Sequence, residues 1–186
     1  MKIVLAGSRK LAFIPEEVIS MLQDHIQAED TFFIGDAPGI DSTFQQFMVE
    51  KGFVNVEIFS SAGYVRNNLG KWRENQIETT LKSKSNALHA FKDREMCKQA
   101  DLGIMIWDQD SAGTLSNAID LLSQDKTCFI YNAVDQEFVR FETSESLEEW
   151  LAKYPEVAQE AHSRLNRFRN RMKIGSKLDS IQSELF

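Results

Sequence analysis

The sequence of 186 residues is poor in the residues that build metal centres and disulfide frameworks. Its two cysteines, Cys97 and Cys128, lie far apart and form no C-x-x-C pair, so we expect two reduced core thiols. The three histidines, His25, His89 and His162, are scattered, and none stands at H-x-x-x-H spacing. These spacings argue against a structural zinc site, and we expect neither a metal nor another cofactor.

Long apolar runs and an excess of positive charge are missing as well. No run approaches membrane-spanning length, and Gly7-Ser8-Arg9 interrupts the short apolar start before it could serve as a signal peptide. Lys and Arg number 21 against 28 Asp and Glu, which gives a net charge of -7. We therefore expect a soluble cytoplasmic protein without a membrane partner, and the charge disfavours a generic nucleic-acid binder.

Short apolar runs alternate with helix-like segments along most of the chain, and 42% of the residues are hydrophobic. Alternating strands and helices predict an α/β fold, a Rossmann-like three-layer sandwich with a mainly parallel sheet and right-handed crossovers. The length suits one compact domain with a real core. We predict buried strands at residues 2–6, 31–35, 54–59, 102–107 and 127–131, and an edge strand at 138–141.

Two segments depart from this pattern. Residues 60–88 are polar and weakly periodic, and we interpret them as a loop followed by a helix near 71–82. Trp72 in this segment is either a lid that closes over a bound base or part of a surface loop.

The sequence changes character again beyond Pro155. Between Lys153 and Lys177 there are seven basic residues and two acidic ones, on an apolar stripe with helical spacing. We therefore predict a Rossmann-like domain over 1–154 and a basic amphipathic helical tail over 155–186. The tail either packs on the core or a second subunit, or contacts nucleic acid or an acidic partner, or frays.

Three loops rich in small residues follow three of the predicted strands, and each leads into a helix. In a parallel sheet these strand ends meet in one crevice, and ligands bind where the strand order reverses. If the order is 3-2-1-4-5 along the predicted strands, the first and third loops flank that point. Free backbone N–H groups at helix starts favour an anion there, so the sequence predicts a phosphate-bearing ligand. The candidate binding residues are Gly7, Ser8 and Arg9; Gly35, Asp36, Gly39 and Asp41; and Asp108, Ser111, Gly113 and Thr114.

Each loop also has a plainer interpretation. The first could be an ordinary turn with an exposed arginine, and the third a surface turn capped by Thr114. Asp36 and Asp41 could bond sugar hydroxyls or simply cap a helix. The glycines do not follow the dinucleotide G-x-G-x-x-G pattern, and the P-loop lysine is missing.

The same residues resemble a known family. Gly7-Ser8-Arg9 followed by Gly35-x-Ala37-x-Gly39-x-Asp41 is similar to the SLOG superfamily of Rossmann-like nucleotide-binding domains. The stretch from Arg94 to Asp108, followed by Ser111-x-Gly113-Thr114, resembles it too, so the likeness covers roughly residues 1–131. Within the superfamily the chain looks most like small bacterial and phage members.

The resemblance implies a nucleotide-like ligand in the crevice, with Arg9, Arg94, Gly113 and Thr114 on the phosphate side, and a homodimer, because LOG-like relatives pair through helices near the crevice. LOG phosphoribohydrolases carry Gly-Gly-x-Gly-Thr-x-x-Glu, in which the glutamate acts in catalysis together with an upstream arginine. Asn117 stands at the position of that glutamate here. An amide cannot act as a general base, so this departure disfavours LOG-type hydrolysis.

Three functions follow as hypotheses. The first is a binding module, a sensor or regulator, for a nucleotide or a nucleotide derivative. The second is an N-glycosidic-bond hydrolase or transferase, LOG-like or deoxyribosyltransferase-like. The third is a DprA-like nucleic-acid-associated protein that uses the basic tail. The catalytic candidates for the second are Asp36, Asp41, Glu95 and Asp108, and the candidates for base stacking are Trp72 and Trp107.

Overall fold

A computed structural model describes residues 1–61, 63–78 and 86–183, with 86–89 and 171–183 described by their backbone only. One seven-stranded sheet in the order β4-β3-β2-β1-β5-β6-β7 forms its centre. Neighbouring strands run parallel except β6 and β7, which are antiparallel. The strands are β1 (Lys2–Gly7), β2 (Thr31–Gly35), β3 (Val56–Ser60), β4 (Arg73–Gln76), β5 (Leu102–Trp107), β6 (Thr127–Asn132) and β7 (Glu137–Phe141).

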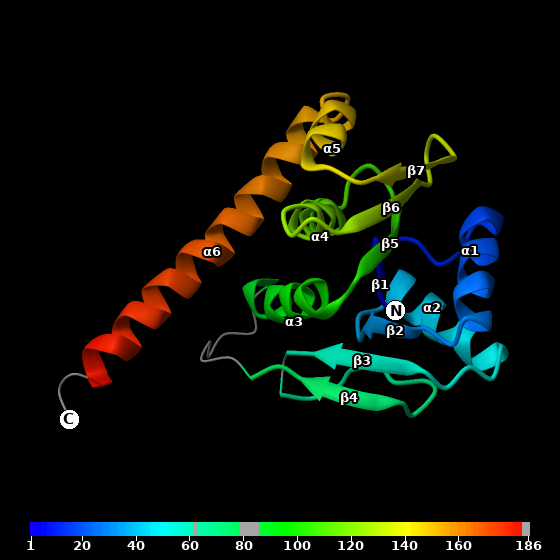
Figure 1. Ribbon diagram of the computed structural model, residues 1–186, viewed down its shortest axis with the longest axis horizontal. Coiled ribbons are helices and arrows are strands. Elements are labelled where there is room, and N and C mark those ends of the chain that lie inside the picture. The colour runs from blue at the N-terminus through cyan, green and yellow to red at the C-terminus, as the bar shows by residue number, and fades with distance from the viewer. Residues whose placement is uncertain (62, 79–85, 184–186) are drawn as a thin grey trace.

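Helices cover both faces of this sheet, as the continuous apolar strands require. α1 (Glu16–Gln27) and α2 (Ile40–Glu50) lie on one face, and α3 (Asn86–Gln99) and α4 (Ala112–Leu122) lie on the other (Figure 1). Side chains of β1 alternate between the two cores: Ile3 and Leu5 pack with α1 and α2, and Val4 and Ala6 pack with α3 and α4. The α/β fold class with a mainly parallel sheet is confirmed.

The order of the five predicted strands is also the one assumed from the sequence, so the switch point lies between β1 and β5. Strand β1 pairs with β2 on one side and with β5 on the other. The loops that follow β1 and β5 therefore flank the crevice where strand order reverses.

The predicted helix near 71–82 is wrong for the residues that the structure describes, because Arg73–Gln76 form β4 beside β3. Residues 79–82 of that prediction lie outside the described residues. An edge strand keeps most of its side chains in water, so this one shows no alternation of apolar and polar residues. Cross-strand pairing holds it instead, including a hydrogen bond of 2.6 Å from the Asn75 amide to Glu57.

The lid hypothesis for Trp72 is wrong too, because this side chain packs at the opposite end of the strands from the crevice. Its indole N–H donates to the Phe53 carbonyl at 3.1 Å, and its ring packs against the core under α1 and α2. Phe53 precedes β3 and Trp72 precedes β4, so this tryptophan lies at the amino ends of the strands. The crevice lies at their carboxyl ends.

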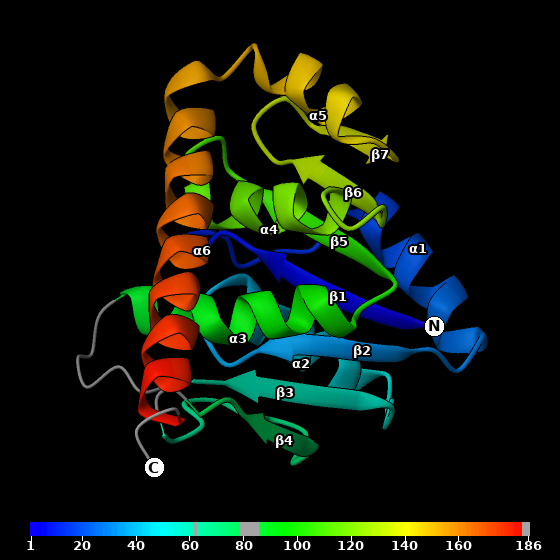
Figure 2. The ribbon, with the colours of Figure 1, turned by 60° about the vertical axis from the view of Figure 1, so that its left-hand side comes forward.

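The chain finishes its described part in two helices, α5 (Ser144–Leu151) and α6 (Pro155–Ser183). Figure 2 shows α6 running along the edge at which β1 and β3 end. Ala158, Ala161 and Leu165 of α6 belong to the core around α4, and the Phe168 ring meets Phe91 of α3 edge to face at 5.0 Å. Of the alternatives for the tail, packing on the core is the one that residues 157–168 of α6 show. Among the described residues, no helix is both long and apolar enough to cross a membrane.

Candidate functional site

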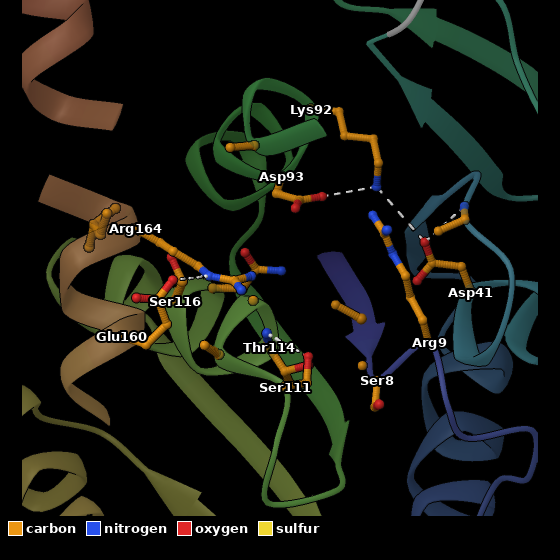
Figure 3. Close-up of a pocket in the computed structure, with 18 of the residues that line it drawn as sticks. Ser8, Arg9, Asp41, Lys92, Asp93, Ser111, Thr114, Ser116, Glu160 and Arg164 are labelled. Atoms are coloured by element: carbon orange, nitrogen blue, oxygen red, sulfur yellow. Dashed lines mark hydrogen bonds and ion pairs between the residues drawn. The ribbon is translucent and has the colours of Figure 1, made fainter. Parts of the chain in front are cut away.

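A cavity of about 600 Å³ lies at the carboxyl ends of β1 and β5, under α6 (Figure 3). Its walls come from the loop after β1, the starts of α2 and α4, one side of α3, and α6. Nine of the predicted site residues line it: Gly7, Ser8, Arg9, Asp41, Arg94, Asp108, Ser111, Gly113 and Thr114.

The loop between β5 and α4 forms the floor beside β1. Ser111 is the N-cap of α4, and its hydroxyl accepts hydrogen bonds from the Thr114 N–H and from the Thr114 hydroxyl, the latter at 3.0 Å. The cap fixes the first turn of the helix, so the positive end of the α4 dipole borders the cavity.

Asp108 braces this floor. One carboxylate oxygen accepts the Ser8 hydroxyl, and the other accepts the Ser111 N–H at 2.8 Å and the Asp110 N–H at 3.2 Å. Burial opposes its ionisation, but these hydrogen bonds outweigh burial and hold the pKa of Asp108 below its usual range. Asp108 therefore ties the loop after β1 to the loop after β5, as a structural carboxylate.

The loop after β1 brings Arg9 to the cavity. Gly7 is needed in this loop because a Cβ there would lie 2.4 Å from the Ile106 carbonyl oxygen of β5. Ser8 continues the contact by donating its N–H to the same oxygen at 3.0 Å. The Arg9 guanidinium extends into the cavity on the side of Asp41 and Lys92 (Figure 3), and it forms no ion pair with any residue that the structure describes.

A buried charge cluster forms the opposite wall. The Lys92 ammonium of α3, whose side chain is only 4% exposed, lies 2.9 Å from Asp93 and 3.8 Å from Asp41. Burial raises the pKa of Asp41 to about 6 against the opposing influence of Lys92. A Cβ on Gly35 would lie 2.2 Å from the Asp41 carboxylate and 2.4 Å from the Lys92 ammonium, so Gly35 makes the room for this pair.

Arg94 lies in the cavity wall, but α4 holds its guanidinium. It donates to the Ser116 carbonyl at 2.9 Å and to the Asn117 side-chain oxygen, and it pairs with Asp120 at 3.1 Å. Asn117, which the resemblance aligns with the LOG glutamate, is thus in direct contact with Arg94. In this arrangement the guanidinium has three acceptors from the protein itself.

Helix α6 supplies the remaining wall with five residues that the sequence did not identify: Glu160, Arg164, Leu165, Arg167 and Phe168. The nearest atom to a Cβ built on Gly113 is the Arg164 guanidinium at 3.5 Å, which places Arg164 at the start of α4. The basic amphipathic stripe was the only sequence signal for this wall. Nothing in that stripe indicates which strand ends it would cover.

Four predicted residues lie outside the cavity lining. Gly35 lies against Asp41 and Lys92, and Gly39 lies against the backbone of Arg9. Glu95 accepts a hydrogen bond from Gln99 on α3. Asp36, 1% exposed, forms a two-pronged ion pair with Arg66, with an Nε–Oδ2 distance of 2.9 Å. Trp107 is fully buried against Trp150 and Tyr154, so its ring offers no face to a base.

Comparisons with protein-family models, with curated proteins and with solved structures returned no match. The resemblance to the SLOG superfamily therefore stays a prediction. Within the described part of the chain, no three His, Cys, Asp or Glu residues come together in a way that could hold a metal ion.

Proposed function

We propose that the cavity binds a nucleotide or a nucleotide-derived phosphorylated ligand, and that the protein acts as a sensor or regulator. The observation that carries this proposal is the mixed character of the lining. Hydrogen-bond donors and cationic groups gather at the ends of β1 and β5, and Ala90, Met96, Leu165 and Phe168 add apolar surface from α3 and α6. A ligand with a phosphate and a flat base needs both kinds of surface.

The phosphate is assigned to the first turn of α4, with Arg9 on one side of it and Arg164 on the other (Figure 3), and with Lys10 also in the lining. A guanidinium matches phosphate geometry with two parallel hydrogen bonds, and helix N-termini favour anions. Arg9 is exposed and lacks an ion-pair partner in the described chain, so a ligand would not need to break a contact to recruit it. Lys10, by contrast, already pairs with Asp110.

Three of the four candidate carboxylates are either held by other groups of the protein or lie outside the cavity lining, which favours binding without turnover. Asp36 is engaged by Arg66, Asp108 by the loops, and Glu95 lies outside the lining. Only Asp41 combines a place in the cavity with a pKa raised to about 6, which suits a general acid or base. This observation supports N-glycosidic cleavage with Asp41 as the second candidate function.

The test is a calorimetric titration against nucleosides, nucleoside mono-, di- and triphosphates, ADP-ribose, NAD and cyclic nucleotides, with product analysis for each ligand that binds. We expect a phosphorylated ligand to bind and to be recovered intact. Arg9→Gln should lower the affinity for that ligand about tenfold, because one charged hydrogen-bond donor is lost. Arg140→Gln on β7 should leave the affinity unchanged.

Other outcomes point elsewhere. Release of a free base that disappears in Asp41→Asn would establish the second candidate in place of a sensor. Absence of binding by every ligand of the panel would overturn the proposal.

A further inference from the structure

One carboxylate in the cavity wall holds two arginines at once. The same Glu160 oxygen, Oε1, accepts a hydrogen bond from Arg164 Nε at 3.0 Å and from Arg167 Nη2 at 3.0 Å. All three side chains come from α6, and all three line the cavity. The group of Glu160, Arg164 and Arg167 thus has a net charge of one positive unit, with its two cations already occupied.

These ion pairs are of the kind that is easily exchanged. The Glu160 side chain is 46% exposed, and those of Arg164 and Arg167 are 46% and 56% exposed. Ion pairs in contact with water are weak because the solvent competes for both partners. Hydrogen bonds from Arg164 and then Arg167 hold the pKa of Glu160 below its usual range, so the carboxylate stays charged near neutrality.

The position of Arg164 gives this group a role in the cavity. Its guanidinium lies beside Gly113 in the first turn of α4, where the helix dipole also favours an anion. A phosphate group that enters here meets Arg164 and, one turn further along α6, Arg167. A phosphate dianion carries more charge and more acceptor oxygens than a carboxylate, so it is the better partner for two guanidinium groups.

We propose that Glu160 is an internal counter-ion that occupies Arg164 and Arg167 until a phosphate group of the ligand displaces it. The inference rests on the proposed function and adds a specificity rule to it. The site selects ligands with a dianionic phosphate, because an uncharged nucleoside cannot displace the carboxylate. Glu160 lowers the affinity for every anion and keeps both arginines paired in the empty protein.

The experiment uses inorganic pyrophosphate and adenosine monophosphate as probes, with adenosine as the uncharged reference. We expect Glu160→Gln to bind both phosphate probes roughly three- to tenfold more tightly than the wild type, and adenosine no more tightly. Glu149→Gln on α5 is the matched control, because it removes the same charge from an exposed position outside the cavity lining. It should bind like the wild type. In an Arg164→Gln/Arg167→Gln background, Glu160→Gln should bring no gain.

The results separate this inference from the proposed function. Wild-type binding with an equal affinity for Glu160→Gln overturns the counter-ion role and leaves the binding function in place. An equal gain in Glu149→Gln also overturns it, because net charge alone would then explain the effect. Failure of all phosphate probes with both proteins removes the two proposals together.

Discussion

At the scale of single residues, four carboxylates that look alike in the sequence have different surroundings. Asp36 pairs with Arg66, Asp108 accepts backbone N–H groups, and Asp41 shares a buried site with Lys92. Glu95 accepts a hydrogen bond from Gln99 on its own helix. The partners Arg66 and Lys92 lie 30 and 51 positions away in the chain (36 to 66 and 41 to 92). Such distances cannot be bridged by local pattern, so only the fold decides which carboxylate is structural and which faces the cavity.

Asp41 should make the stability of the protein depend on pH. Its pKa rises from 3.8 to about 6 on folding because burial disfavours the charged form. Between these values the folded state holds a proton that the unfolded state has lost, so this stabilisation is complete below 3.8 and disappears as the pH rises through about 6. Asp41→Asn lacks this titration. Its free energy of unfolding, relative to wild type, should therefore rise by about 2 kcal/mol from pH 4 to pH 7.

Urea unfolding at a series of pH values measures this difference. Loss of the contact with Lys92 also changes the free energy of unfolding at every pH. The result is therefore the change of the difference between variant and wild type with pH, not its size at one pH. Asp24→Asn, which removes a carboxyl from an exposed position on α1 outside the cavity lining, is the matched control. A flat difference for Asp41→Asn would show that Asp41 titrates normally in the folded protein.

At the scale of elements, backbone proximity explains the glycines better than ligand contact does. Gly39 has φ +81°, and a Cβ there would lie 2.3 Å from the Arg9 carbonyl oxygen. The loop before α2 therefore supports the loop that carries Arg9. Gly113 differs, because its nearest Cβ neighbours are at 3.5 Å and 3.9 Å, an ordinary contact distance.

This contrast gives a paired prediction. Gly39→Ala should lower the free energy of unfolding by about 2 kcal/mol or more, since a side chain meets both strain at positive φ and a fixed backbone. Gly113→Ala should change it by less than about 1 kcal/mol and in the stabilising direction, because alanine favours the helix. Thermal and urea unfolding of the two variants beside the wild type measure both. Equal destabilisation by the two alanines would contradict the geometry.

The elements that the sequence predicted well share one property, a local apolar pattern. Strands β1 and β5 are buried on both faces, so their branched apolar runs are visible without any partner. Strand β4 has the sequence Arg-Glu-Asn-Gln, and only pairing with β3 makes it a strand. The loops after β1 and β5 were located because they directly follow such visible strands. On the α3 wall only Arg94 was predicted, through the resemblance, and the α6 wall was missed, because tertiary packing brings both helices to the site.

At the scale of the whole molecule, α6 joins the core and the site. Ala161 and Leu165 bury themselves against α4, while Arg164 and Phe168 face the cavity. The boundary between 154 and 155 therefore separates two segments of sequence whose side chains share one core. The predicted homodimer stays a prediction.

Removing the helix should damage both roles at once. A chain of residues 1–154 loses Ala158, Ala161 and Leu165 from the core, which should cost about 4 kcal/mol or more and lower the Tm by roughly 10 °C. A chain of residues 1–170 keeps every described side chain of the α6 wall, so it should melt within a few degrees of the full chain, by the same scaling. Calorimetry on the three chains is the measurement. A 1–154 chain that melts like the full chain would show that α6 is not part of the core.

The position of α6 in the chain also sets an order of events during synthesis. Every strand of the sheet precedes α6, so a nascent chain can complete the sheet and the helices on its faces while one wall of the cavity is still inside the ribosome. The cavity closes only after Phe168 has emerged. The growing polypeptide therefore forms the sheet before the cavity, and a product that stopped before Pro155 would possess the sheet without the α6 wall.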